Sequence, residues 1–355
     1  MSEMRPVLAA TAERLFAAHG GRDAAIAPRG AWPAALWQAL EAAGLTLASV
    51  AEDKGGAGVD RGDVAVILRA AGRHAAPVPL AETMLAAWLL SESGIAVPPG
   101  PLALAPMLRE DAAGLRIDGT RRLAGTARGI PWARDCVALA VLARGPHGDC
   151  VALVPRAAAR IEPSRNLAGE PRDTVAFDDV TLAADQVAPA GAGIDLDALW
   201  LRGALVRISS MAGALETVLD STVRHANERV QFGRPIAKFQ AVQQQIAVLA
   251  ANVAAAGAAA DAAAHDGADV AIAAAKARIG EAASLACGIA HQVHGAMGFT
   301  QEHALHRCTT RLWAWREEFG DETHWWAWLG REAARQGGDG LWPFVTAAAT
   351  RAGAR

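Results

Sequence analysis

Two long alanine-rich stretches that follow a short turn sequence constrain the fold of this chain most strongly. Residues 239–265 and 269–294 have the apolar spacing of helices, and a third helical stripe precedes the turn. That stripe comprises Leu205, Ile208, Ala212, Leu215, Leu219, Thr222 and Ala226. Because alanine on facing helices permits close approach, these stretches predict an antiparallel helical bundle.

The turn before residue 239 contains a cation, an aromatic ring, a glycine and a proline. We expect Gly233 to end one helix and Pro235 to open the next, because glycine suits a helix C-terminus and proline suits the first helical turn. The turn then presents Arg229 and Phe232, which suit a flat anionic ligand such as a dinucleotide. A solvated arginine and a buried phenylalanine are the alternative interpretation.

The chain has three regions of different character. Residues 1–100 carry apolar residues at helical spacing, residues 101–190 alternate short apolar runs with Gly, Pro and Asp, and residues 191–355 are helical again. The runs of strand character are Leu115–Ile117, Cys136–Leu142, Cys150–Val154 and Thr174–Val180. The sequence therefore predicts an α+β multidomain protein with an N-terminal helical domain, a small middle β-domain and a C-terminal helical bundle domain.

Composition and charge exclude several classes of protein. Apolar residues make up 52% of the 355 residues, which excludes a disordered chain, and a net charge of −3 without a basic tract makes nucleic acid an unexpected partner. Polar residues interrupt the alanine-rich stretch 250–264, so we expect no membrane span. We expect a cytoplasmic protein, because there is no signal-peptide pattern and the scattered cysteines suggest reduced thiols. They are Cys136, Cys150, Cys287 and Cys308.

Two segments resemble signature motifs of the acyl-CoA dehydrogenase family. Arg229 to Gln240 is similar to that family's R-x-x-F-G-x-x-I-x-x-F-Q segment, and Gln292 to Glu302 is similar to its later Q-x-x-G-x-x-G-x-x-x-E segment. The two segments lie one helical hairpin apart, as they do in the family. Weaker similarity spans nearly the whole chain and includes Gly55 to Gly58, Ile117 to Gly119 and Phe177 to Val180.

The resemblance implies a fold and a cofactor. The family fold is an N-terminal helical domain, a middle β-barrel-like domain and a C-terminal four-helix bundle, with FAD bound close to a subunit boundary. By resemblance, Arg229 contacts the FAD pyrophosphate, Phe232 packs on the cofactor, and Gln292 with Gly295 lines the diphosphate path. A permanent cation and a glycine backbone that permits close approach are what a pyrophosphate needs. A simple helix stop is the alternative for Gly295 and Gly298.

The resemblance also implies α,β-dehydrogenation of an acyl-CoA thioester, in which a carboxylate removes the α-proton and a hydride passes to the flavin. Where many family members have the catalytic Glu followed by Gly, counting without gaps finds Phe319 followed by Gly320. Glu317 and Glu318 directly precede this position and are the candidate catalytic residues. A solvated acidic face is the alternative for both.

Other family members place the base on the helix before the turn. There, residues 201–204 contain no acid, and Arg202 and Arg207 are the candidate substrate-binding residues.

The middle domain departs from the family pattern as well. Residues 104–111 replace the family loop that contacts flavin and acyl-CoA, and residues 123–127 replace its Trp-Ile-Thr strand. Thr126, as a hydroxyl donor, and Trp132, as an aromatic ring against the flavin, are candidate cofactor-binding substitutes. A place in the hydrophobic core is the alternative for Trp132.

Two histidines flank Gln292 and invite a metal interpretation. His291 and His294 are three residues apart, and no carboxylate stands beside them to complete a site. We therefore expect no metal and read both rings as structural or ligand-lining.

Three functions fit these residues. The first is a FAD-dependent acyl-CoA dehydrogenase with an acid close to Phe319 as the base. The second is a non-catalytic partner subunit that completes the flavin site of a related chain, and the third is a flavin oxidase or monooxygenase of the same superfamily. The sequence resembles the smaller subunits of bacterial heteromeric acyl-CoA dehydrogenases that act on bulky acyl groups such as steroid side chains. The resemblance implies an acyl-CoA substrate, a homo- or hetero-oligomer, and electron-transfer flavoprotein as a partner.

Overall fold

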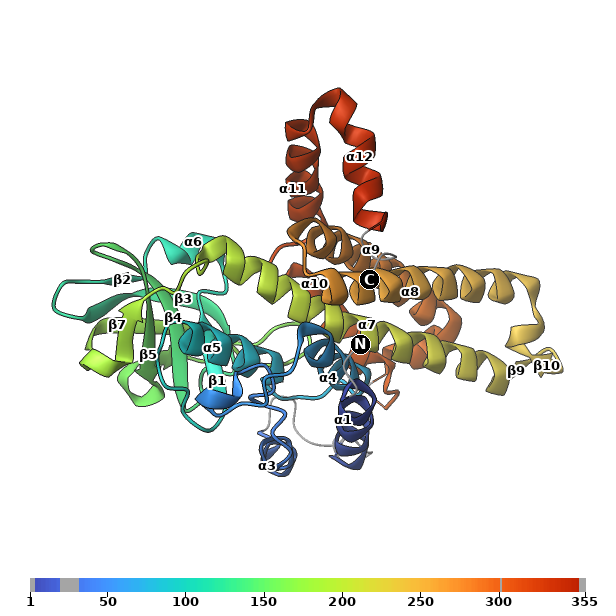
Figure 1. The fold of residues 1–355 in the computed structure, drawn as a ribbon. Coiled ribbons are helices and arrows are strands. Elements are labelled where there is room, and N and C mark those ends of the chain that lie inside the picture. Colours follow the sequence, from blue (N-terminus) through green and yellow to red (C-terminus); the bar gives the residue numbers. More distant parts are fainter. Residues whose placement is uncertain (1–3, 20–31, 301, 351–355) are drawn as a thin grey trace. The chain divides into compact units, whose positions relative to one another are not determined.

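The computed structural model describes residues 4–19, 32–300 and 302–350, and Figure 1 draws its fold. Gln301, which belongs to the second motif, lies outside these residues. The helices are α1 (Arg5–His19), α3 (Ala34–Ala42), α4 (Arg61–Arg73), α5 (Leu80–Glu92), α6 (Arg109–Ala112), α7 (Leu196–Glu228), α8 (Gln240–Asp266), α9 (Asp269–His294), α10 (Leu305–Glu317), α11 (Glu322–Arg335) and α12 (Gly337–Thr350). Short 3-10 turns are η1 (Glu52–Lys54), η2 (Arg156–Ala158), η3 (Ala184–Gln186), η4 (Ile236–Lys238) and η5 (Gly295–Phe299).

The strands occupy the middle of the chain, with one further pair before α8. They are β1 (Leu102–Ala105), β2 (Arg116–Ile117), β3 (Arg122–Pro131), β4 (Ala138–Gly145), β5 (Gly148–Pro155), β6 (Arg160–Glu162), β7 (Arg172–Thr181), β8 (Val187–Pro189), β9 (Val230–Gln231) and β10 (Arg234–Pro235). All four predicted strand segments are strands, and β1, β3, β6 and β8 add to them.

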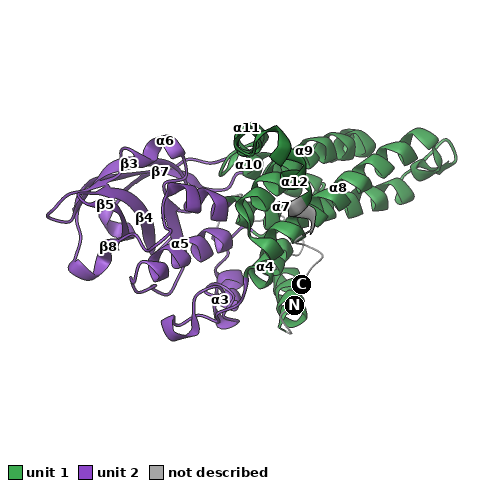
Figure 2. Cartoon of the chain, turned by 45° about the horizontal axis from the view of Figure 1, so that its top comes forward, with its two compact units in different colours: residues 1–20, 61–76, 204–355 green, residues 21–60, 77–203 purple. Residues whose placement is uncertain are grey.

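The chain divides into two compact units, coloured separately in Figure 2. Unit 1 comprises residues 1–20, 61–76 and 204–355, and unit 2 comprises residues 21–60 and 77–203. The N-terminal helices, expected as one domain over residues 1–100, contribute to both units. Helices α1 and α4 belong to unit 1, whereas α3 and α5 belong to unit 2.

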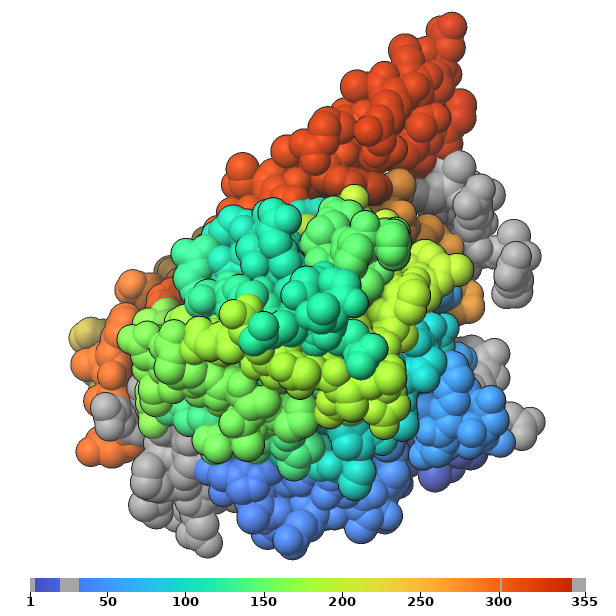
Figure 3. Space-filling model, turned by 90° about the vertical axis from the view of Figure 1, so that its left-hand side faces the viewer, coloured from blue at the N-terminus to red at the C-terminus, as the bar shows by residue number. Residues whose placement is uncertain are grey.

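Unit 2 is organised around one mixed sheet in the order β6-β7-β3-β2-β4-β5-β8, with β1 paired to β4. The pairings of β4 with β1 and with β2 are parallel, and the remaining neighbours are antiparallel. Leu139, Ala140 and Val141 are fully buried at consecutive positions of β4, so both faces of this strand are covered. Helix α5 packs against β1, β4 and β5. Residues of the strand region, in green, form much of the surface seen in Figure 3.

Unit 1 contains the predicted helical bundle. Helix α9 keeps the predicted bounds, and α8 begins one residue after the predicted start. Helix α8 packs along α9, and seven of the fifteen buried residues of α9 are alanines, which permit close helix packing. Among the residues described, α8 alone is long and apolar enough to cross a membrane. That is weak evidence, because a core helix of a bundle satisfies the same criteria.

Helices α4 and α7 cross at a contact made by two glycines. A Cβ atom on Gly213 of α7 would lie 1.9 Å from the carbonyl oxygen of Arg69 in α4. A Cβ atom on Gly72 of α4 would lie 1.8 Å from the carbonyl oxygen of Ser210 in α7. The two backbones therefore touch, and neither position has room for a side chain.

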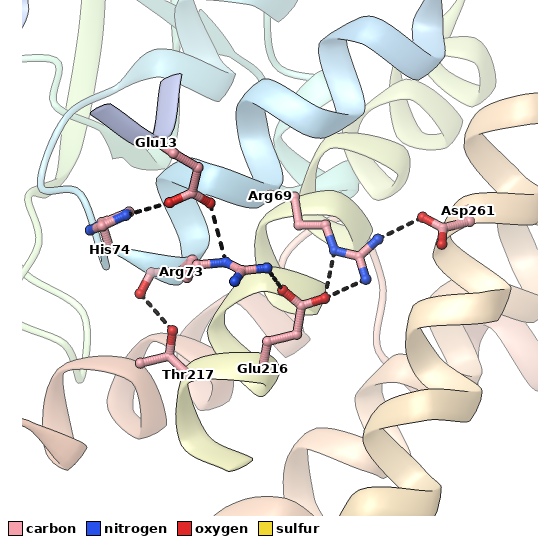
Figure 4. A network of polar contacts seen from close by, with 7 residues as sticks. All are labelled: Glu13, Arg69, Arg73, His74, Glu216, Thr217 and Asp261. Atoms are coloured by element: carbon pink, nitrogen blue, oxygen red, sulfur yellow. Dashed lines mark hydrogen bonds and ion pairs between the residues drawn. The ribbon is translucent and has the colours of Figure 1, made fainter. Parts of the chain in front are cut away.

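A network of ion pairs reinforces this crossing (Figure 4). Glu216 of α7 accepts hydrogen bonds from Arg69 and Arg73, both of α4. Arg69 also pairs with Asp261 of α8 at 2.6 Å, and Arg73 pairs with Glu13 of α1 at 3.2 Å. A connected network of this kind fixes side-chain geometry better than isolated surface pairs do, and it joins four helices of unit 1.

The turn between α7 and α8 differs from the prediction. Helix α7 ends at Glu228, and β9 and β10 then form a two-stranded hairpin. Gly233 is therefore not a helix cap, and Pro235 lies in β10 rather than in the first turn of α8. Phe232 and Gly233 have φ values of 51° and 78°, the left-handed pair that closes a tight two-residue hairpin.

Candidate functional site

The hairpin presents the first motif to solvent. The side chain of Phe232 at its tip is 92% exposed, so the alternative of a buried phenylalanine is wrong for this chain. The guanidinium of Arg229 is exposed and makes no hydrogen bond or ion pair with any residue that the structure describes. Phe239 supports the tip, with its ring centroid 6.1 Å from that of Phe232 and 4.3 Å below the guanidinium of Arg234.

The second motif lies where α9 ends. Gln292 is exposed in the last turn of α9, and Gly295, with a φ of 59°, has no atom within 4 Å of its missing Cβ. The backbone of Gly295 therefore faces open space. Gly298 has a different reason to be glycine, because its Cβ would lie 2.9 Å from the Cβ of His294 and 3.4 Å from Leu305.

Two histidines bring the motifs together. The rings of His225, one turn before Arg229, and His294, directly before Gly295, stack with centroids 4.3 Å apart. The ends of α7 and α9 are therefore neighbours. An unpaired guanidinium, an open glycine backbone and an exposed aromatic ring all belong to this region of unit 1. These groups suit the pyrophosphate and the ring system of FAD.

The candidate acids lie where α10 ends, with Glu317 as its last residue and Glu318 as the first residue of the loop before α11. Glu318 is 14% exposed and accepts a hydrogen bond of 2.6 Å from Nε of Arg207, which is itself only 3% exposed. Phe319, at the family position of the base, is buried with a φ of 55°. Glu317 is 62% exposed and 3.8 Å from Arg316, which fits the alternative of a solvated acid.

A buried lysine holds this loop in place. Lys276 of α9 is 1% exposed, and its Nζ donates hydrogen bonds of 2.7 Å to the carbonyl oxygens of Arg316 and Gly320. Burial lowers the pKa of Lys276 to about 8, and the nearby Glu318 opposes that shift. Both ends of the loop thus depend on a residue that sequence reasoning missed, because a lysine in an alanine-rich helix is usually solvated.

The depressed pKa of Lys276 predicts how stability changes with pH. Between the folded pKa of about 8 and the ordinary value of 10.5, the unfolded chain keeps a proton that the folded chain has released. The contribution of Lys276 to the free energy of unfolding therefore rises with pH in this window and is lost as pH falls through 8. Relative to Lys276→Met, the native chain should gain about 2 to 3 kcal/mol between roughly pH 7 and pH 10. Urea unfolding followed by circular dichroism measures this gain, and a pH-independent difference contradicts it.

Of the candidate binding residues in unit 2, one is exposed on the sheet and another is buried in the hydrophobic core. Thr126 is exposed on β3, opposite Ala176 of β7, and its hydroxyl is accessible. Trp132 is buried, with its ring edge-on to Trp32 at 6.0 Å, as the core alternative expects. Arg202 lies over the ring of Trp88 at 4.3 Å.

The structure agrees with the prediction that the cysteines are reduced thiols. Cys136, Cys287 and Cys308 are buried, Cys150 is half-buried, and all four are free. Burial raises the pKa values of Cys136 and Cys287 to about 12, so these thiols are unreactive.

Two segments of the chain match models of known protein families. Residues 4–96 match the family described as acyl-CoA dehydrogenase, N-terminal domain, and residues 201–321 match acyl-CoA dehydrogenase, C-terminal domain. The Mycobacterium tuberculosis protein named acyl-CoA dehydrogenase IpdE2 is 31% identical over 315 residues, which cover 86% of this chain and 89% of that protein.

Solved structures share the fold. A chain of the ChsE4-ChsE5 complex from Mycobacterium tuberculosis superposes with a TM-score of 0.85 at 23% identity, over 94% of this chain and 98% of that one. A variant of the Tcur3481-Tcur3483 steroid ACAD superposes with a TM-score of 0.83 at 27% identity, over the same shares of the two chains. The fold class predicted from the sequence is confirmed.

Proposed function

Because the chain belongs to the acyl-CoA dehydrogenase family, with FAD as the family's cofactor, we propose that it is one subunit of a heteromeric acyl-CoA dehydrogenase. It completes a flavin site, and a second, homologous subunit supplies the acid that removes the α-proton. The observation that carries this proposal is the buried Phe319 at the position of the family's base. The adjacent Glu318 is engaged by Arg207.

The residues of this chain bind and orient rather than transfer protons. Arg229 provides a fixed fork of donors for phosphate oxygens, and Gly295 lets the diphosphate approach the backbone. Phe232 offers an exposed ring against the cofactor. FAD supplies the hydride acceptor when it is bound. The similarity to structures named as a two-protein complex and a two-protein steroid enzyme supports a heteromer and a bulky, steroid-type acyl group.

A second candidate is a dehydrogenase that is active without a different partner, with Glu318 as its base. In favour of this candidate, Glu318 is partly accessible and is held beside the family position by Arg207 and by the loop that Lys276 fixes. Against it, an oxygen of the Glu318 carboxylate already accepts a hydrogen bond from Nε of the buried Arg207, so that oxygen is engaged in the fold.

Purification of the full chain alone and together with a homologous subunit of the same organism separates the two candidates. We expect the lone chain to be colourless and inactive. The mixture should hold flavin and reduce an artificial electron acceptor with an acyl-CoA. A lone chain that is yellow and active contradicts the heteromer.

Two pairs of variants in the assembled enzyme test the assigned roles. Arg229→Ala should weaken flavin retention by at least roughly tenfold, because a charge-assisted contact to phosphate contributes about 1.5 to 3 kcal/mol. Arg331→Ala, at an exposed position of α11, serves as the matched control. Glu318→Gln should leave kcat within a few-fold of the unmodified enzyme, as should Glu317→Gln. A loss of roughly a hundredfold or more, confined to Glu318→Gln, would identify Glu318 as the base.

A further inference from the structure

Three histidines that are distant in sequence meet at one point of unit 1. They are His225 of α7, His294 at the end of α9, and His303 in the loop before α10. One ring nitrogen from each lies within 4.8 Å of the other two. The ring of His303 stands edge-on to that of His294, with centroids 4.7 Å apart.

The hydrogen bonding of His294 leaves one nitrogen free to bind a ligand. Its Nδ1 lies 2.7 Å from the carbonyl oxygen of Ala290, and because that oxygen can only accept, Nδ1 carries the proton. Nε2 of the neutral ring therefore presents a bare lone pair. This atom is buried and has no hydrogen-bond partner in the described part of the chain, and the residue is 4% exposed. An imidazole oriented by a backbone carbonyl through its other nitrogen is the usual state of a metal ligand.

We propose that His225, His294 and His303 together bind one divalent transition-metal ion of the zinc class. Three imidazoles suit Zn²⁺, Ni²⁺ or Cu²⁺. Among the residues that the structure describes, the cluster contains no thiolate and no carboxylate, which disfavours Mg²⁺ and Ca²⁺. Three protein ligands leave a fourth tetrahedral position for water or an anion. This site replaces the expectation of no metal, which considered only the pair on α9. The fold adds ligands from α7 and from the loop.

Metal binding requires a small movement of the rings. With Zn–N bonds of 2.0 to 2.1 Å, tetrahedral ligands lie about 3.4 Å apart, so the rings must approach one another. His303 can move because it belongs to a loop. Its Nδ1 accepts a hydrogen bond of 3.2 Å from the backbone N–H of Leu305. In the neutral ring this places the proton on Nε2. Binding through Nε2 therefore moves the proton to Nδ1 and breaks this long hydrogen bond, in exchange for a metal–imidazole bond, which is the stronger interaction.

The position of the cluster gives the ion a structural role. His225 is one turn before Arg229, and His294 directly precedes Gly295, so the ion would fix the ends of both motif-bearing helices to each other. The role does not depend on the heteromer proposed above, since all three ligands come from this chain.

Zinc titration of the full chain, stripped with a chelator and followed by calorimetry, tests the site. We expect one Zn²⁺ per chain, a rise in the midpoint of thermal unfolding when Zn²⁺ is added, and visible d–d bands when Co²⁺ replaces it. His225→Ala and His303→Ala should each weaken Zn²⁺ binding by at least roughly a hundredfold and abolish the rise. His265→Ala, at the end of α8, is the matched control and should bind as the unmodified chain does.

The loop position of His303 makes its variant the safest reporter, because circular dichroism should show an unchanged fold without metal. Zinc binding that persists unchanged in both His225→Ala and His303→Ala overturns the proposal, as does a native chain that binds no Zn²⁺ at millimolar concentration. Persistence of the cobalt bands in Cys150→Ser excludes the half-buried thiol as their source.

Discussion

Gly213→Ala should destabilise the chain by about 3 kcal/mol or more. The added Cβ would lie 1.9 Å from the carbonyl oxygen of Arg69 and 2.8 Å from the backbone nitrogen of Arg73. Both neighbours are backbone atoms of α4, so no side chain can rotate away, and the two helices must separate. Separation would also stretch the hydrogen bonds from Arg69 and Arg73 to Glu216. Urea unfolding monitored by circular dichroism gives the free energy directly.

Gly288→Ala provides the matched control for that experiment. Gly288 lies inside α9, and no atom lies within 4 Å of its missing Cβ. The same chemical change should therefore stabilise the chain by about 0.5 to 1 kcal/mol, since alanine is the better helix former. Equal effects at the two positions would show that α4 and α7 do not make a close backbone contact in solution.

Arg207→Met should be the next most damaging change, with a loss of about 3 kcal/mol. The arginine is buried, and its Nε donates to the carboxylate of Glu318 at 2.6 Å, while its guanidinium carbon lies 5.6 Å from the ring centroid of Trp315. Methionine fills much of the volume but leaves a partly buried carboxylate without its guanidinium. Glu318→Gln keeps an oxygen that accepts from Arg207, so it should cost only about 1 to 2 kcal/mol.

A double-mutant cycle isolates the pair. Arg207→Met combined with Glu318→Gln should be less destabilised than the sum of the single variants, by roughly 1 kcal/mol or more, because the second change removes the carboxylate that the first leaves unpaired. Additive losses would show that Arg207 acts only through packing against Trp315.

The long helices of unit 1 could be predicted because their signals are local. The apolar spacing of 269–294 gave the bounds of α9 from residues within one segment, and the turn residues around each strand located four strands in the same way. The prediction for the connection between α7 and α8 was wrong, although the residues that decide its structure are also neighbours in the sequence. Gly233 and Pro235 predict a helix stop and a helix start, whereas Phe232 and Gly233, two consecutive residues with positive φ, form a hairpin.

Contacts between distant residues could not be predicted from one sequence. In the sequence, Gly72 and Gly213 are indistinguishable from glycines that merely weaken a helix. Only the crossing of α4 and α7 in the structure shows that neither position has room for a side chain. The three histidines come from two helices and a loop, and only one of the three belonged to the pair visible in the sequence. In the sequence, Arg207 is a substrate-binding candidate and Glu318 a separate catalytic candidate, yet in the fold they form an ion pair.

At the tip of the β9–β10 hairpin, the residue proposed to bind the flavin is unfavourable for the stability of the chain. Phe232 adopts the left-handed backbone conformation that asparagine or glycine takes easily, at a cost of about 1 to 2 kcal/mol for a phenylalanine, and its ring is almost wholly in water. The edge-on contact with the ring of Phe239, at 6.1 Å, offsets these penalties only in part, by about 0.5 to 1.5 kcal/mol. A search for variants that merely raise the melting temperature of the lone chain would therefore discard this side chain early, and with it the ring proposed to meet the flavin.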